Sequence, residues 1–159
     1  MIDKALGRYP DRIIGDASDP YLLRWYIIPR NRFFNIYLHK FCRSDDDRAL
    51  HDHPWLFNAS ILLRGKYLEH TPKGAFARRV GIPVFRWGKA PHRVELEKYY
   101  EDFIPRWGMS FVREHPVWTI FITGPVVREW GFYCPSGWRH WIEFTDPTSN
   151  GNKVGRGCE

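Results

Sequence analysis

Residues 50–69 read LHDHPWLFNASILLRGKYLE, and this stretch holds the first half of a metal-binding pattern. His51 and His53 stand one residue apart, at the start of an apolar run that Gly65 closes with a turn. On a β-strand, residues i and i+2 point to the same face, so both imidazoles would face one side and Asp52 the other. Imidazole is a common ligand of divalent transition metals, and the pair therefore predicts part of a metal site. The alternative is a strand entry whose histidines are only hydrogen-bonded.

The rest of the chain from Arg32 onward consists mainly of short apolar and aromatic runs separated by Gly, Pro and polar turns. Strand patterns spaced at intervals near ~10 residues favour an all-β sandwich or barrel over βαβ units. The strands are expected at residues 33–42, 59–63, 66–70, 76–80, 84–87, 92–96, 117–124, 127–134 and 138–144.

A chain of 159 residues is long enough for one domain with a real core, and too short to expect two. Residues 1–31 are interpreted as a lead-in with a short helix from about Pro20 to Ile27, because Asp19 can cap a helix and Pro20 suits its first position. Residues 32–145 would form the barrel. Residues 146–159 are rich in Gly and small polar residues and are expected to be a flexible tail.

The three cysteines form no CxxC pair and no even set, which argues against a disulfide scaffold or a structural zinc ribbon. Cys158 is expected to be an exposed thiol in the tail. The N-terminus has no apolar signal-peptide core, and no stretch reaches ~18 uninterrupted apolar residues. A soluble protein of the reducing cytoplasm is therefore expected.

The formal net charge of +6 and the pI near 9.4 would suit an anionic partner. The basic residues are scattered, however, without the Lys/Arg run of a nucleic-acid tail, which argues against nucleic-acid binding. The chain also lacks a Walker A sequence, a GxGxxG loop and a G-x-S-x-G elbow, so nucleotide-driven and serine-hydrolase chemistry are unsupported. A small-molecule substrate is the expected partner, and the oligomeric state is left open between a monomer and a homodimer.

A metal site needs a third ligand, and His92 offers it after the turn GKAP, at the start of an expected strand. Strands distant in sequence lie side by side in a barrel, so His92 can face the first two histidines across the interior. With His51, His53, Asn58 and Gly65 in step, the chain resembles the cupin superfamily, whose first motif joins His-x-His to a glutamate and a glycine. The resemblance implies a jelly-roll, or double-stranded β-helix, barrel. A metal-free cupin fold is its alternative.

Asn58 stands where the first cupin motif has glutamate, and an amide is a weaker ligand than a carboxylate. The chain thus resembles the cupins with a three-histidine iron site, such as the thiol dioxygenases. This implies a mononuclear Fe(II) oxygenase or dioxygenase acting on a small anionic substrate, with Zn, Mn or Ni as alternative ions. His140, in the run CPSGWRH, is a rival third ligand, and Glu69 could replace the missing carboxylate.

Two further residues are predicted to act in catalysis. Tyr67 would supply a phenol for proton transfer, and Arg86, if it points inward, would clamp an anionic group. Tyr133 and Arg128 are alternatives for these roles, and a core phenol or a surface charge is the plainer interpretation of each. The competing functions are a non-catalytic ligand-binding or assembly module and a metal-dependent isomerase, because a fold alone does not choose among them.

Overall fold

The computed structural model describes residues 7–45, 49–104, 109–146 and 155–159. These residues form antiparallel strands and one short helix. The elements are β1 (Arg12–Gly15), β2 (Pro20–Tyr26), β3 (Asn35–Phe41), β4 (Leu50–His51), β5 (Phe57–Arg64), β6 (Tyr67–Thr71), β7 (Gly74–Arg78), β8 (Pro83–Trp87), β9 (Arg93–Leu96), β10 (Lys98–Ile104), β11 (Met109–Glu114), β12 (Val117–Thr123), β13 (Gly131–Cys134), β14 (Gly137–His140) and α2 (Trp141–Phe144).

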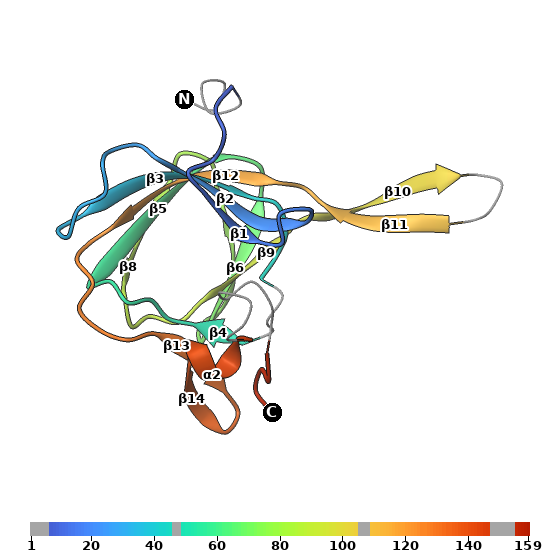
Figure 1. Ribbon diagram of the computed structural model, residues 1–159. Coiled ribbons are helices and arrows are strands. Elements are labelled where there is room, and N and C mark those ends of the chain that lie inside the picture. The colour runs from blue at the N-terminus through green and yellow to red at the C-terminus, as the bar shows by residue number, and fades with distance from the viewer. Residues whose placement is uncertain (1–6, 46–48, 105–108, 147–154) are drawn as a thin grey trace.

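Two antiparallel sheets face each other and enclose the interior (Figure 1). The larger sheet has the order β1-β2-β3-β12-β5-β8. The opposite wall consists of β7-β6-β9 and β14-β13-β4, which meet where His51 and His92 form an antiparallel bridge. Four strands of each wall, β3-β12-β5-β8 and β4-β9-β6-β7, make a double-sheet jelly roll. The predicted all-β jelly-roll architecture is confirmed.

The inward faces of the strands are apolar at one end of the barrel and polar at the other. On β5, Asn58, Ser60 and Leu62 are buried at alternate positions, as the two-residue period of a strand requires. Leu62 belongs to an apolar cluster with Val117 of β12 and residues of β6 and β9. Asn58, four residues earlier on the same face, lies at the polar end. The buried face of β5 is therefore apolar near Leu62 and polar near Asn58.

The hairpin of β10 and β11 projects away from the barrel (Figure 1). It is inserted between β9 of one wall and β12 of the other. Its strands pair from Lys98 opposite Glu114 to Ile104 opposite Met109. At its base, the ring of Tyr99 stacks on that of His115 with a centroid distance of 4.3 Å. The segment between the strands expected at residues 92–96 and 117–124 thus contains a two-stranded arm.

The predicted N-terminal helix at residues 20–27 is wrong, because this segment is strand β2. β2 is hydrogen-bonded to β1 on one side and to β3 on the other, so that the barrel's larger sheet begins inside residues 1–31. Trp25 and Leu22 are buried by this pairing, and tertiary burial overrides the local capping signal. Among the described residues the one helix is α2, and no helix is long and apolar enough to span a membrane.

The expectation that Cys158 is an exposed thiol is also wrong. Cys134 at the end of β13 is bonded to Cys158, so Cys158 is not a free thiol. Around this bond, the backbone N–H groups of Gly155 and Gly157 donate to the carbonyl of Phe144. Residues 155–159 therefore lie against α2, in contrast to the flexible end expected for this segment, while residues 147–154 lie outside the described part of the chain.

The disulfide predicts a simple thiol count. Protein unfolded in guanidinium without reductant should expose one reactive thiol, that of Cys42, and reduced protein should expose three. A Cys42→Ser variant is the control and should expose none before reduction. Because the bond closes a loop with a sequence separation of 24 residues, Cys158→Ser should lower the free energy of unfolding by about 3 kcal/mol. Three thiols without reductant would show that the bond does not form.

Candidate metal centre

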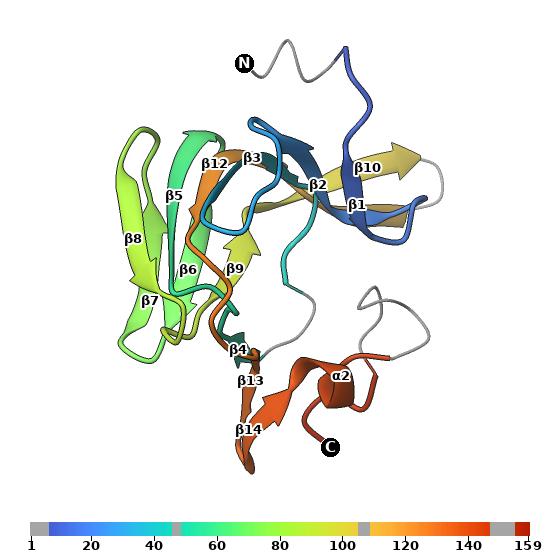
Figure 2. The ribbon, with the colours of Figure 1, turned by 60° about the vertical axis from the view of Figure 1, so that its left-hand side comes forward.

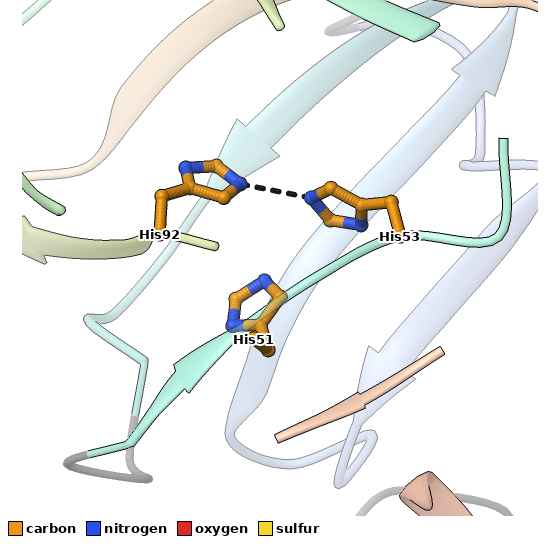
Figure 3. Close-up of side chains that lie close together, drawn as sticks. All are labelled: His51, His53 and His92. Carbon is orange, nitrogen blue, oxygen red and sulfur yellow. Dashed lines mark hydrogen bonds between the residues drawn. The ribbon is translucent and has the colours of Figure 1, made fainter. Parts of the chain in front are cut away.

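Three histidines from two distant segments converge inside the barrel (Figure 3). His51 ends β4, His53 follows two residues later, and His92 directly precedes β9. One ring nitrogen of each faces the other two, and the candidate ligand atoms all lie within 4.8 Å of one another. The Nε2 atoms of His53 and His92 are 2.8 Å apart. The structure thus brings the three predicted ligands together, from β4 and the start of β9.

The backbone holds these histidines in place. The N–H of each of His51 and His92 donates to the carbonyl of the other at 3.0 Å, and the N–H of His53 donates to the carbonyl of Gly88 at 2.8 Å. Gly88 is required here because a Cβ at this position would lie 1.6 Å from the carbonyl oxygen of Trp55. The turn before His92 is therefore packed directly against the chain that leaves His53.

Carboxylates lie behind two of the imidazoles. Nδ1 of His92 is 2.7 Å from Oε1 of Glu69, although the contact lacks the alignment of a linear hydrogen bond. Nδ1 of His51 is 4.0 Å from Oδ2 of Asp45. A carboxylate on the far nitrogen of a ligating histidine orients the ring and favours the tautomer whose other nitrogen is free to bind a metal.

Burial keeps His51 and His53 neutral. It lowers the pKa of His51 to about 4, against a smaller raising effect of Asp45. The pKa of His53 is also held well below its usual value, first by burial and then by its neighbours His92 and His51. A metal ligand must offer a free nitrogen lone pair, so both rings are in the ligating form at neutral pH.

Glu69 is fully buried on β6 and is surrounded by cationic groups. It forms ion pairs with Arg78 of β7 and Arg86 of β8 in addition to its contact with His92. Burial alone would raise the pKa of Glu69, but the contacts with His92 and Arg86 outweigh it and hold the pKa below its usual range. Glu69 therefore lies as a carboxylate on the side of His92 that faces away from His53, behind the candidate ligand rather than beside it.

The two predicted catalytic residues both lie inside the barrel. Tyr67 is buried within the apolar cluster that contains Leu62, and this burial raises the pKa of its phenol. Arg86 points inward, as the anion clamp requires, but it pairs with Glu69 and its Nη1 donates to Oγ of Ser60 at 3.3 Å. Catalytic roles for Tyr67 and Arg86 stay predictions.

The remaining candidates differ in where they lie. Asn58 is fully buried opposite Arg86 and Thr123, and neither atom of its amide has a hydrogen-bond partner among the described residues. His140, the rival ligand, instead ends β14 as the N-cap of helix α2, and its Nε2 lies 3.1 Å from Oε2 of Glu129. It is not a member of the histidine cluster.

Asp52, between the first two histidines, has a role that the sequence did not reveal. Its side chain points away from the cluster and is fully buried under β13 and β14. Its carboxylate accepts hydrogen bonds from Arg128 at 2.7 Å and from the backbone N–H of Gly131 at 2.8 Å. Tyr133 and Trp138 donate to it as well, each at 3.3 Å. Asp52 thus attaches the histidine segment to the two C-terminal strands, and Arg128 and Tyr133 serve this contact.

No protein-family model and no curated protein sequence matches the chain. Solved structures with a similar fold are double-stranded β-helix and cupin proteins. An uncharacterised conserved protein with a double-stranded β-helix domain from Klebsiella pneumoniae is 11% identical, with 70% of this chain and 78% of that chain covered and a TM-score of 0.47. KdgF from a Halomonas species is 13% identical, with 69% and 85% covered and a TM-score of 0.47.

A cupin superfamily protein from Desulfitobacterium hafniense is 9% identical, with 69% of this chain and 83% of that chain covered and a TM-score of 0.47. Likenesses of this size concern the fold alone. The site is therefore interpreted from the residues of this chain.

The Asp52 contacts predict a large effect of a small change. Asp52→Asn should lower the free energy of unfolding by about 2 kcal/mol, because it removes a buried charge and turns donors of the amide toward the donors of Arg128 and Gly131. Glu129→Gln is the control, since Glu129 is exposed and should change stability by less than about 0.5 kcal/mol. Urea unfolding measures both, and equal effects would contradict the assigned role of Asp52.

Proposed function

We propose that this protein is a metal-dependent enzyme of the cupin type, which binds one divalent ion through His51, His53 and His92 and acts on a small anionic substrate. The observation that carries the proposal is the convergence of three ring nitrogens within 4.8 Å of one another. Three further features support it: the ring of His53 is neutral, the backbones of His51 and His92 are hydrogen-bonded to each other, and the carboxylate of Glu69 lies behind His92.

The donor set fits a transition-metal ion. Two nitrogens bound at about 2.1 Å to one ion, at a right angle, lie about 3.0 Å apart. The 2.8 Å between Nε2 of His53 and Nε2 of His92 is close to this spacing. Three neutral imidazoles suit Fe, Zn, Ni, Cu or Mn better than Ca or Mg, which prefer oxygen ligands.

We further propose that the ion is iron and that the reaction is an O2-dependent oxidation. A bound ion would supply Lewis acidity and, if it is Fe(II), redox chemistry with O2, with coordination positions left for substrate. Because the three ligands are neutral, the ion would keep its +2 charge and favour an anionic substrate.

The protein's own residues would orient the ligands and limit access of water to them. Glu69 holds the ring of His92 from behind. Trp55 and Phe121 cover the ring of His53, with centroid distances of 5.2 Å and 6.3 Å. Aromatic cover of this kind lowers the local dielectric and strengthens the pull of the site on an anion.

Metal analysis tests the proposal directly. Protein reconstituted with Fe(II) under anaerobic conditions should bind about one equivalent, and His51→Ala, His53→Ala and His92→Ala should each lose about tenfold or more in affinity. His70→Ala is the matched control, because His70 also lies on the barrel but pairs with Glu95 at 2.7 Å outside the cluster. Metal binding that persists unchanged in the three cluster variants would overturn the proposed site.

A non-catalytic binding module is the second candidate function. It is favoured by the contact between His53 and His92, because 2.8 Å is also the distance of a hydrogen bond between two neutral imidazoles. In such a module the unpartnered buried amide of Asn58 would help to bind a ligand without chemistry.

Oxygen uptake separates the two functions. Fe(II)-loaded protein should consume O2 in the presence of at least one member of a panel of small carboxylic acids, with and without a thiol group, and His53→Ala should abolish this uptake. The His70→Ala variant should retain it. Saturable binding of a panel member without O2 uptake would favour the module.

A further inference from the structure

Arg24 lies on the inner face of β2 and is held by two aromatic neighbours from β3. Its Nε donates to Nε2 of His39 at 2.9 Å, and its guanidinium carbon lies 4.6 Å from the ring centroid of Tyr37. His39 is buried, and burial, followed by the charge of Arg24, holds its pKa well below the usual value. Arg24 is therefore positioned by a neutral acceptor and by a ring, neither of which cancels its charge.

The guanidinium of Arg24 has unused binding capacity. In the part of the chain that the structure describes, no carboxylate pairs with it and its two terminal nitrogens make no hydrogen bond. The other inward or partly buried arginines are engaged: Arg86 pairs with Glu69, and Arg128 with Asp52. A guanidinium presents its donors as a planar fork that matches a carboxylate. The fork of Arg24 is open for such a group.

The charges around Arg24 favour an anion. Arg12 stands opposite it in the register of β1 and β2, and the guanidinium of Arg30 lies 5.8 Å from the ring of Tyr26, also on β2. Burial lowers the pKa of Arg24 to about 10, and Arg12 and Arg30 lower it as well. The side chain remains positive at neutral pH. Arg12 and Arg30 are exposed and therefore screened by solvent, so the inward guanidinium of Arg24 is the group that a bound anion would contact.

Arg24 is connected to the histidine cluster through a short row of rings. His39 stacks on Phe121 with a centroid distance of 5.0 Å, and Phe121 lies 6.3 Å from the ring of His53.

Two buried polar atoms beside this row lack a hydrogen-bond partner among the described residues. They are Nδ1 of His39 and Oγ1 of Thr119, the register partner of His39 on β12. Buried polar groups are normally satisfied by protein or by a bound molecule. The unpartnered atoms are therefore a second sign, independent of charge, that a polar ligand belongs on this side of the barrel.

We propose that Arg24 binds the carboxylate of the substrate, while a second donor group of the same molecule reaches the metal held by the histidines. The ligand class is a small organic anion with a carboxylate at one end and a metal-binding oxygen, nitrogen or sulfur at the other. This inference rests on the proposed function for its metal end, whereas the Arg24 end stands on its own contacts. A single guanidinium matches the single charge of a carboxylate, which favours it over a phosphate dianion.

The test uses Co(II)-loaded protein, whose visible spectrum reports ligands that reach the metal. It is titrated with malonate, succinate and glutarate, and with acetate and inorganic phosphate as comparison anions. At least one dicarboxylate should bind about tenfold more tightly than acetate, and Arg24→Gln should remove this advantage. Arg24→Lys should restore only part of it, since an ammonium keeps the charge without the fork.

Arg12→Gln is the matched control, because it removes the same charge from the exposed register partner of Arg24. It should change dicarboxylate affinity less than about twofold. Circular dichroism and melting temperatures establish whether the variants fold. If Arg24→Gln does not fold, the dicarboxylate affinities of Arg24→Lys and Arg12→Gln are compared instead. The same titrations on metal-free protein, followed by the shift in melting temperature, report the Arg24 end alone.

Equal dicarboxylate affinity of wild type and Arg24→Gln in the cobalt protein would overturn the inference and leave the proposed metal site intact. Tighter binding of phosphate than of any dicarboxylate, dependent on Arg24, would overturn the assignment to a carboxylate. Failure to bind Co(II) would instead overturn the proposed function. In that case, carboxylate-dependent stabilisation of the metal-free protein that disappears in Arg24→Gln would support the Arg24 site, and its absence would overturn that site too.

Discussion

The reciprocal backbone hydrogen bonds between His51 and His92 are the contact on which the site depends. They join β4 to the start of β9, and they do so at the residues whose side chains form the cluster. Directly opposed residues of an antiparallel pair lie about 5.5 Å apart at Cα when they exchange both hydrogen bonds, and their side chains share a face. The same bridge therefore joins the two parts of the wall and brings His51 and His92 together.

The neighbouring layers give this contact its rigidity. Behind it, the buried carboxylate of Glu69 is neutralised by two arginines and lies against His92. On the outer side, Asp52 binds the β13–β14 pair, and the disulfide attaches the C-terminal residues to the end of β13. Figure 2 shows the C-terminal end beside α2. Each layer uses residues outside the histidine cluster, so the geometry of the cluster depends on contacts made elsewhere in the chain.

Much of the barrel and of the histidine cluster could be predicted from local patterns. The two-residue period of a strand places both histidines of His-x-His on one face. The turn before His92 indicates that a strand follows, next to the third histidine. Strand β2 could not be predicted this way, because Asp19-Pro20 begins a strand as readily as a helix and its pairing with β3 is a long-range contact. Arg24 was missed for the same reason, since its direction is defined only when β2 is a strand.

The disulfide and the Asp52 contacts were missed for another physical reason. Cys158 is 24 positions from Cys134, and the partners of Asp52 follow it by 76 to 86 positions. Nothing in the local periodicity records such distant partners. The odd number of cysteines hid a bonded pair beside the one free thiol, Cys42.

The strict alternation of His51, Asp52 and His53 also guards against misfolding. A slip of this segment by one residue would exchange its two faces, sending the carboxylate among the imidazoles and the rings beneath the C-terminal strands. Both faces would then be mismatched at once, with Arg128 deprived of its acceptor and the cluster broken. A shifted register of this segment is therefore destabilised on both of its faces, which favours the single correct alignment.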